Sequence, residues 1–214
     1  CYGGDGTLLE GVHRLCGAPI PVMGINAGHL GFLTSAPSAG LNLIFKEIAE
    51  GRLTTEARSM IEVTGDYAEQ PDTTLALNEF TVQRHGAGMI SVETYVDDQM
   101  VATYHGDGVI FSTPTGSTAY SLSAGGPVVE PTARNFIVSP ICAHSVHANA
   151  YVLSPERVIT VQTEKNSYKP VLLSVDGGRA FSLRSGDSIE VRRSKFDTKL
   201  VRLSKRSFCE ILQK

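Results

Sequence analysis

Gly3-Gly4-Asp5-Gly6-Thr7 stands almost at the start of the chain and predicts a phosphate-binding turn that contains one carboxylate. Three glycines in four positions allow positive φ and remove the Cβ atoms that would hold a phosphate away from the backbone N–H groups. Apolar residues then recur at helical spacing, so the turn opens a helix predicted over 6–16. Free N–H groups and the positive end of the helix dipole favour an anion there.

Asp5 is the unusual group in this turn, because a carboxylate repels an anion unless it takes a proton or holds a metal. A plainer interpretation also fits, namely a tight strand-to-helix turn in which Asp5 is a cap. Only Cys1 and Tyr2 precede Gly3, whereas a phosphate turn needs a strand that leads into it. The sequence therefore predicts a fragment that lacks a natural N-terminal part.

The composition is that of an ordinary globular protein with one large domain or two small ones. The 214 residues are 42% hydrophobic and 19% charged, with a net charge of −3, which gives no indication of a nucleic-acid partner. No apolar run approaches the roughly 20 residues of a membrane span, and there is no signal peptide, so no membrane partner is expected. The four cysteines and the pair His144 and His147 lack metal-site spacing, so we predict no metal ligands and a cytoplasmic protein with reduced thiols.

The hydrophobic pattern changes near residue 55. Before it, helix 6–16, a strand over 20–25 and a helix near 39–50 predict the remaining, truncated part of an α/β domain, 1–55. After it, period-two patterns predict a mainly β domain, 56–198, and a C-terminal segment, 199–214, that returns to the first domain. One helical stretch, about 117–124, interrupts strands expected at 57–64, 73–84, 89–96, 99–104, 108–112, 136–139, 158–163, 170–175, 180–184, 188–193 and 199–204.

A second glycine-containing segment runs from Asp107 to Pro127. An apolar strand leads into hydroxyl-rich residues around Pro114-Thr115-Gly116 and then into a helix that carries Tyr120. The hydroxyl groups offer donors and acceptors to a polyhydroxylated or phosphorylated ligand, and the tyrosine offers a stacking face. A capped helix start explains the same pattern without a ligand.

Asn78 and Glu79 lie inside an apolar strand, where two adjacent polar residues break the alternation. A buried amide can bind the edge of a base, and a carboxylate can hold ribose hydroxyls or an amine. A strand end explains the pair equally well. Asp176-Gly177 follows another apolar strand and is a common hairpin signal, so a turn is the preferred interpretation there.

At these residues the chain resembles the NAD kinase family. The family's Gly-Gly-Asp-Gly-Thr turn, Asn-Glu pair and long Asp-Gly…Ser-Thr-Pro-Thr-Gly-Ser-Thr-Ala-Tyr-Ser segment occur in that order at 3–7, 78–79 and 107–121, and Ser-Val-Asp-Gly follows at 174–177. The likeness covers essentially the whole chain. The Thr-Pro-Thr-Gly-Ser-Thr-Ala-Tyr run is highly specific, whereas the first motif is shared with lipid kinases and, in near form, with phosphofructokinases.

The resemblance implies transfer of the γ-phosphoryl group of ATP to the adenosine 2′-hydroxyl of NAD, which gives NADP. Asp5 would be the general base on that hydroxyl, since phosphoryl transfer relies on positioning and charge neutralisation with a carboxylate that accepts the proton. Gly3, Gly4, Gly6 and Thr7 would meet phosphates. Mg²⁺ or another divalent metal would bridge ATP oxygens with few protein ligands.

The resemblance also implies the NAD contacts. Asn78 and Glu79 would hold the adenosine part, Asp107 would meet the nicotinamide end, and Tyr120 would lie against a base. The turn at 176–178 would close the site across a subunit interface in a homodimer or homotetramer. The other implied positions are Gly6, His105, Thr118, Ala119, Ser121, Ser123, Asp176 and Gly178. His105 stands where the family often has arginine, so a positive charge there is titratable.

Two alternatives remain open. A lipid or sphingoid-base kinase shares the first motif but should not carry the Asn-Glu pair or the Thr-Ala-Tyr segment. A regulatory module or fragment could bind NAD(P) without turnover, although the retained Asp5 argues against this. A dehydrogenase is disfavoured, because no G-x-G-x-x-G follows a strand, and there is no P-loop lysine either.

Overall fold

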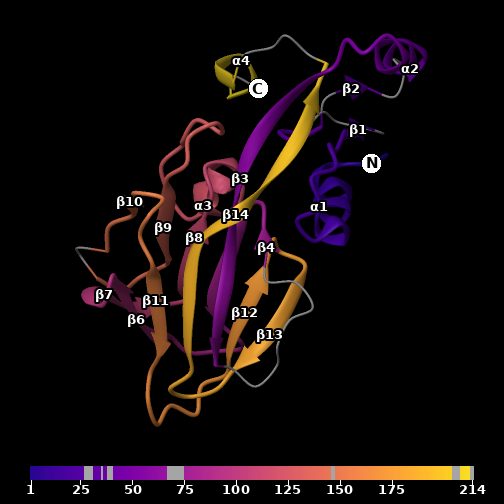
Figure 1. Cartoon of the computed structure of the whole chain (residues 1–214). Coiled ribbons are helices and arrows are strands. Elements are labelled where there is room, and N and C mark those ends of the chain that lie inside the picture. Colours follow the sequence, from indigo (N-terminus) through magenta and orange to yellow (C-terminus); the bar gives the residue numbers. More distant parts are fainter. Residues whose placement is uncertain are drawn as a thin grey trace. The chain divides into compact units, whose positions relative to one another are not determined.

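The computed structural model describes residues 1–26, 31–34, 36–37, 41–66, 75–145, 148–203 and 208–212. His147 and parts of the predicted helix 39–50 and strand 73–84 lie outside these ranges. The chain forms two compact units: unit 1 contains 1–58 and 196–214, and unit 2 contains 59–195. Helices prevail in the first and strands in the second (Figure 1), which confirms the predicted fold class. No helix among the described residues is long and apolar enough to cross a membrane.

Unit 1 contains its first helix and several other short elements. These are α1 (Asp5–Leu15), β1 (Ile25–Asn26), β2 (Ala36–Pro37), α2 (Leu41–Ala49) and α4 (Phe208–Leu212). Leu8 and Val12, four residues apart, bury one face of α1, so the predicted helix is confirmed. The continuous strand predicted over 20–25 is wrong. Val22 pairs in parallel with Leu200 in an isolated bridge, whereas Ile25 pairs with Tyr2, so the segment changes partner before a ladder can form.

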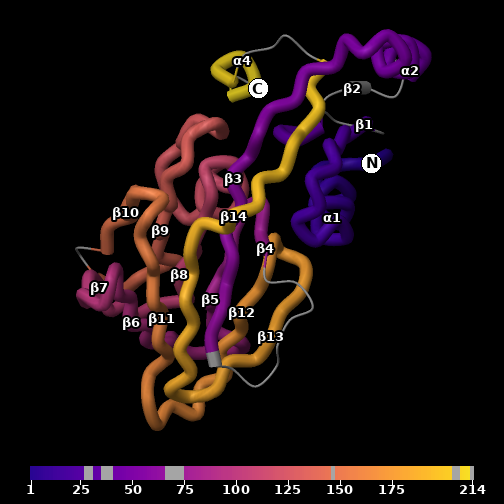
Figure 2. Tube along the Cα trace, in the orientation of Figure 1, coloured from indigo at the N-terminus to yellow at the C-terminus, as the bar shows by residue number. Residues whose placement is uncertain are grey.

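Among the described residues, two six-stranded sheets pass through unit 2. Their strand orders are β10-β9-β8-β5-β12-β13 and β4-β3-β14-β11-β6-β7. Figure 2 shows β3 and β14 running side by side in the second sheet. The strands are β3 (Thr54–Asp66), β4 (Leu75–Ala76), β5 (Glu79–Arg84), β6 (Ile90–Val96), β7 (Gln99–Gly106), β8 (Gly108–Ser112), β9 (Phe136–Ile141), β10 (Tyr151–Leu153), β11 (Ile159–Thr163), β12 (Val171–Val175), β13 (Arg179–Leu183) and β14 (Ser188–Arg202).

The core of unit 2 consists of inward-facing apolar side chains from both sheets. Phe80, Phe111 and Phe136 are its largest fully buried members, and β-branched residues such as Val161 and Ile189 surround them. Alternating burial along β6 and β11 shows the period-two pattern that predicted these strands. A 3₁₀ helix (Thr115–Thr118) and α3 (Tyr120–Ser123) replace the single helix predicted over 117–124.

Candidate functional site

The glycine turn of unit 1 opens α1, with Gly4 as its N-cap residue. The Gly3 N–H donates to the Ile25 carbonyl at 2.9 Å, which attaches the turn to β1. Gly4 and Gly6 are exposed, and a Cβ built on either would meet no atom within 4 Å. Since the first N–H groups of a helix lack intrahelical partners, this open turn can receive an anion.

The Asp5 carboxylate turns towards the segment that follows β1. Its Oδ2 accepts the N–H of Phe32 at 2.9 Å, and its Oδ1 accepts those of Leu33 and Thr34, both at 3.2 Å. A Cβ on Gly31 would lie 2.2 Å from Oδ1, so the backbone approaches too closely for a side chain there. A carboxylate has about four lone-pair positions, so three donors orient it and leave about one position for a ligand.

In unit 2, the Asp176 carboxylate holds the backbone bend at residues 77–79, which carries the Asn78–Glu79 pair. Oδ2 accepts the N–H of Leu77 at 2.9 Å, and Oδ1 accepts those of Asn78 at 2.8 Å and Glu79 at 2.9 Å. The Asp176 N–H in turn donates to the Glu79 carbonyl at 2.9 Å. Asp176 begins the turn between β12 and β13, so the predicted hairpin is confirmed. The sequence did not indicate that its carboxylate binds the bend.

The carbonyl groups of the same bend are bound by the segment after β8. The Thr113 N–H donates to the Asn78 carbonyl at 2.9 Å, and its Oγ1 donates to the Leu77 carbonyl at 2.5 Å. Oγ1 also accepts the Gly116 N–H at 3.1 Å. A Cβ on Gly116 would lie 2.1 Å from the Asn78 carbonyl oxygen. The bend is therefore fixed on both its donor and its acceptor sides.

Glu79 is a buried carboxyl group with bonding capacity left over. Its side chain is only 5% exposed, the Tyr120 N–H donates to it, and its Oε2 has no hydrogen-bond partner among the described residues. Burial, followed by the neighbouring charge of Asp176, raises the pKa of Glu79 to about 8. At neutral pH, Glu79 is therefore an acid that can both donate and accept a hydrogen bond.

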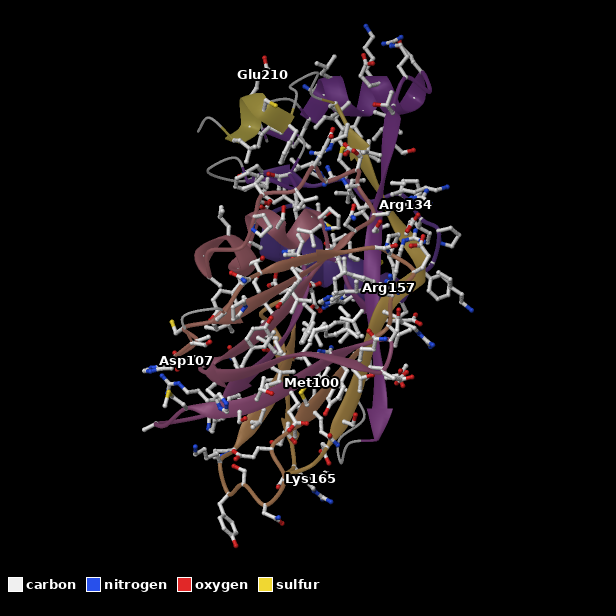
Figure 3. All side chains as sticks on the ribbon, turned by 90° about the vertical axis from the view of Figure 1, so that its left-hand side faces the viewer. Met100, Asp107, Arg134, Arg157, Lys165 and Glu210 are labelled. Atoms are coloured by element: carbon white, nitrogen blue, oxygen red, sulfur yellow. The ribbon has the colours of Figure 1, made fainter. Side chains whose placement is uncertain are left out.

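Tyr120 donates its N–H to Glu79, and two residues that the sequence did not single out, Cys142 and Arg84, act on Tyr120 and Asp107 respectively. Burial raises the pKa of the Tyr120 phenol, and the charges of Cys142, Asp107 and Glu79 raise it further. Asp107, which stands between β7 and β8 (Figure 3), accepts a hydrogen bond from Arg84 Nε at 2.6 Å. Arg84 lies opposite Asp107 because β5 pairs with β8. A correct prediction of this strand register would have identified Arg84 as the partner of Asp107.

The hydroxyl-rich segment divides into structural and accessible residues. Ser117 bonds to the backbone at Pro114 and Val129, which supports the structural interpretation for part of the segment. The Ser121 side chain is fully buried, with its Oγ 3.0 Å from Ser139 Oγ. The half-buried or exposed positions are Thr118, Ala119, Tyr120 and Ser123.

The remaining predicted positions are at the surface. The His105 side chain is exposed on β7, and its carbonyl accepts the N–H of His144 at 2.7 Å. Gly178 is exposed in the β12–β13 turn, where its N–H donates to the Val175 carbonyl at 2.9 Å. Within the described ranges, no group of three or more His, Cys, Asp or Glu side chains could hold a metal ion.

Solved structures with the same fold identify the class of protein. A yeast NADH kinase in complex with NADH superposes with a TM-score of 0.90 and 28% sequence identity, and covers 100% of this chain and 63% of its own. An NAD kinase from Archaeoglobus fulgidus in complex with ATP gives a TM-score of 0.84 and 34% identity, with 100% and 82% coverage. The fold is thus that of kinases which act on nicotinamide nucleotides.

Sequence relatives identify the family. The ATP-NAD kinase N-terminal domain matches residues 1–53, and the ATP-NAD kinase C-terminal domain matches residues 77–203. The NAD kinase of Natranaerobius thermophilus is 38% identical over 98% of this chain and 74% of its own length. The NAD kinase of Symbiobacterium thermophilum is 40% identical over 99% and 75%. The chain belongs to the NAD kinase family, a family of phosphotransferases whose activity is the ATP-dependent phosphorylation of NAD.

Proposed function

We propose that this chain binds NAD through unit 2 and transfers the γ-phosphoryl group of ATP to the adenosine 2′-hydroxyl of NAD, which gives NADP. The observation that carries this proposal is Glu79, a buried carboxyl group whose Oε2 lacks a partner among the described residues and which lies beside the partly exposed Tyr120. An unsatisfied buried polar atom costs about 1–3 kcal/mol, and a ribose hydroxyl would remove that cost. The adjacent tyrosine ring offers a stacking surface to a base.

Asp5 is the proposed general base. The amides of Phe32, Leu33 and Thr34 fix its carboxylate, and about one lone-pair position remains to accept the proton of the hydroxyl. A fixed carboxylate suits phosphoryl transfer, in which the protein contributes positioning and electrostatic stabilisation more than covalent chemistry. The exposed Gly4 and Gly6 at the start of α1 support phosphate binding at the turn formed by Gly3, Gly4, Gly6 and Thr7.

Mg²⁺ is proposed to arrive with ATP. The described residues provide no cage of carboxylates, and Mg²⁺ commonly binds through substrate phosphates, waters and only one or two protein groups. When bound, the ion would neutralise charge on the phosphate oxygens. The chain's own part is the glycine turn, whose N–H groups orient the phosphates, and Asp5, which accepts the proton.

In unit 2, we assign the adenosine part of NAD to Asn78 and Glu79, the base to Tyr120 and the nicotinamide end to Asp107. The ion pair with Arg84 orients the Asp107 carboxylate, which supports a fixed contact there. These roles and those of the other positions remain predictions that derive from the family resemblance. The other positions are Gly6, His105, Thr118, Ala119, Ser121, Ser123, Asp176 and Gly178.

We also propose a homodimer or homotetramer in the cytoplasm. The oligomer derives from the family resemblance. The compartment is supported by Cys1, Cys16, Cys142 and Cys209, all of which are free and exposed, as expected of thiols in a reducing environment.

The experiment is a turnover assay of the 214-residue chain with NAD or NADH, each with ATP or polyphosphate, and with products separated by chromatography. We expect ATP-dependent formation of NADP. Binding of NAD without any product would instead favour the alternative, a module that binds NAD(P) without turnover.

The base assignment is tested with Asp5→Asn. We expect NADP formation to fall by about 10³-fold or more while NAD affinity stays within a few fold, because a positioned base commonly contributes 10²–10⁴-fold. Asp97→Asn is the matched control, since the Asp97 carboxylate also accepts a backbone N–H, that of Val158 at 3.0 Å, in a surface hairpin. Near-full turnover of Asp5→Asn would refute the assignment.

A further inference from the structure

We propose that Asp176 is a positioning residue, which acts on NAD through the Asn78–Glu79 bend and not by direct contact. Its carboxylate would hold the bend in the conformation from which Glu79 receives a ribose hydroxyl. The inference rests on the proposed function of unit 2. It differs from the expectation that the 176–178 turn meets NAD itself.

The hydrogen bonds of the bend carry the argument. The N–H groups of Leu77, Asn78 and Glu79 all point at one carboxylate, at 2.8–2.9 Å. Leu77 and Asn78 connect the two-residue strand β4 to β5, and Glu79 is the first residue of β5. Leu77, Asn78 and Glu79 are all buried, so water cannot readily replace the carboxylate. Unpaired buried N–H groups would be costly, which makes Asp176 a structural requirement of this bend.

The arrangement requires two acceptor oxygens at a left-handed backbone position. Asp176 has φ of +46°, a conformation that Asp and Asn tolerate better than most residues. Asparagine would therefore keep the turn, but it offers one acceptor oxygen and would direct its NH₂ group at a backbone N–H. Asp176→Asn separates the contribution of the carboxylate from that of the turn.

The charge of Asp176 also affects the pKa of Glu79. The groups that face the Glu79 carboxyl in the described structure are the Asp176 carboxylate from the β12–β13 turn and Tyr120 from α3, through its N–H and its phenol. Asp176 raises the pKa of Glu79, whereas the Tyr120 N–H lowers it. Removal of the Asp176 charge should therefore lower the pKa of Glu79, an effect that a purely structural defect elsewhere would not produce.

The test compares Asp176→Asn with Asp97→Asn in the full chain. Asp97 has φ of +48° in the β6–β7 hairpin, and its carboxylate accepts the Val158 N–H at 3.0 Å and pairs with Arg157, so it matches Asp176 in backbone conformation and in holding a backbone N–H. We expect Asp176→Asn to speed hydrogen exchange at 77–79 by 10-fold or more. It should also weaken NAD binding by 10-fold or more and shift the pH midpoint of Glu79, followed by NMR of labelled glutamate, to lower pH. Asp97→Asn should change none of the three.

The outcomes separate this inference from the proposed function. Unchanged exchange at 77–79 and an unchanged Glu79 midpoint in Asp176→Asn would overturn the inference, whether or not NAD binds. Faster exchange and a lower midpoint together with unchanged NAD affinity would also overturn it, because the bend would then not serve NAD. Failure of the unmodified chain to bind NAD would refute the proposed function, and the exchange and titration results would still decide whether Asp176 holds the bend.

Discussion

Asp5 and Asp176 show the same local chemistry at the scale of single residues. Each carboxylate accepts the N–H groups of three consecutive residues, 32–34 for Asp5 and 77–79 for Asp176. In both places the segment contains a bend, and a charged acceptor satisfies its N–H donors. A carboxylate in a glycine-rich turn therefore has a structural role besides any role in ligand binding, because it fixes the backbone segment whose N–H groups it accepts.

Glu79 gives a prediction about stability against pH. Its pKa is raised from 4.5 to about 8 in the folded chain, so between these values the folded state holds a proton that the unfolded state has lost. The stabilisation is complete below pH 4.5 and is lost as the pH rises through about 8, with a slope of at most about −1.4 kcal/mol per pH unit. Glu79→Gln should flatten this slope in urea unfolding measured from pH 5 to 8.5.

The control for this measurement is Glu190→Gln, which changes an exposed carboxyl on β14. It should leave the slope unchanged. An equal slope in Glu79→Gln and the unmodified chain would show that Glu79 does not carry the extra proton.

At the scale of elements, hydrophobic periodicity predicted the strands well wherever apolar residues marked the inward face, as in β6 and β11. It divided β14 into two strands, because the buried positions in the middle of that strand are Ser194 and Thr198, which interrupt the apolar pattern. It missed β10, a strand of only three residues. Short strands depend on pairing with a neighbour, which the sequence does not display.

The candidate site, like the strands, could be predicted from local sequence only in part. Local motifs identified Asp5, Asn78 and Glu79, because glycines and broken alternation are visible in the sequence. The contacts of Asp176 with 77–79 span about a hundred positions, and the Arg84–Asp107 pair depends on strand register, so neither could be predicted from local pattern.

Gly116 provides a prediction about the packing of these elements. In Gly116→Ala, the new Cβ would lie 2.1 Å from the Asn78 carbonyl oxygen and 2.6 Å from Ser112 Oγ, so the 3₁₀ helix and the bend would have to separate. We expect a loss of about 1–3 kcal/mol in the free energy of unfolding, as for other overpacked sites. Gly178→Ala is the matched control, because its nearest atom would be 3.7 Å away. Equal stability of the two variants in urea unfolding would contradict the packing argument.

At the scale of the whole molecule, the proposed contacts predict a different main footprint for each ligand. If NAD binds to the bend and the α3 segment, then NAD alone should slow hydrogen exchange at 77–79 and 118–123 in unit 2, because binding stabilises the closed state of the amides it contacts. A non-hydrolysable ATP analogue should slow exchange at 3–7 and 31–34 in unit 1, where the glycine turn and the amides bonded to Asp5 lie. The exposed residues 164–166 supply an internal reference that neither ligand should change. Protection by NAD confined to 3–7 and 31–34 would show that the dinucleotide belongs to unit 1, and the assignment of Asn78 and Glu79 would then be wrong.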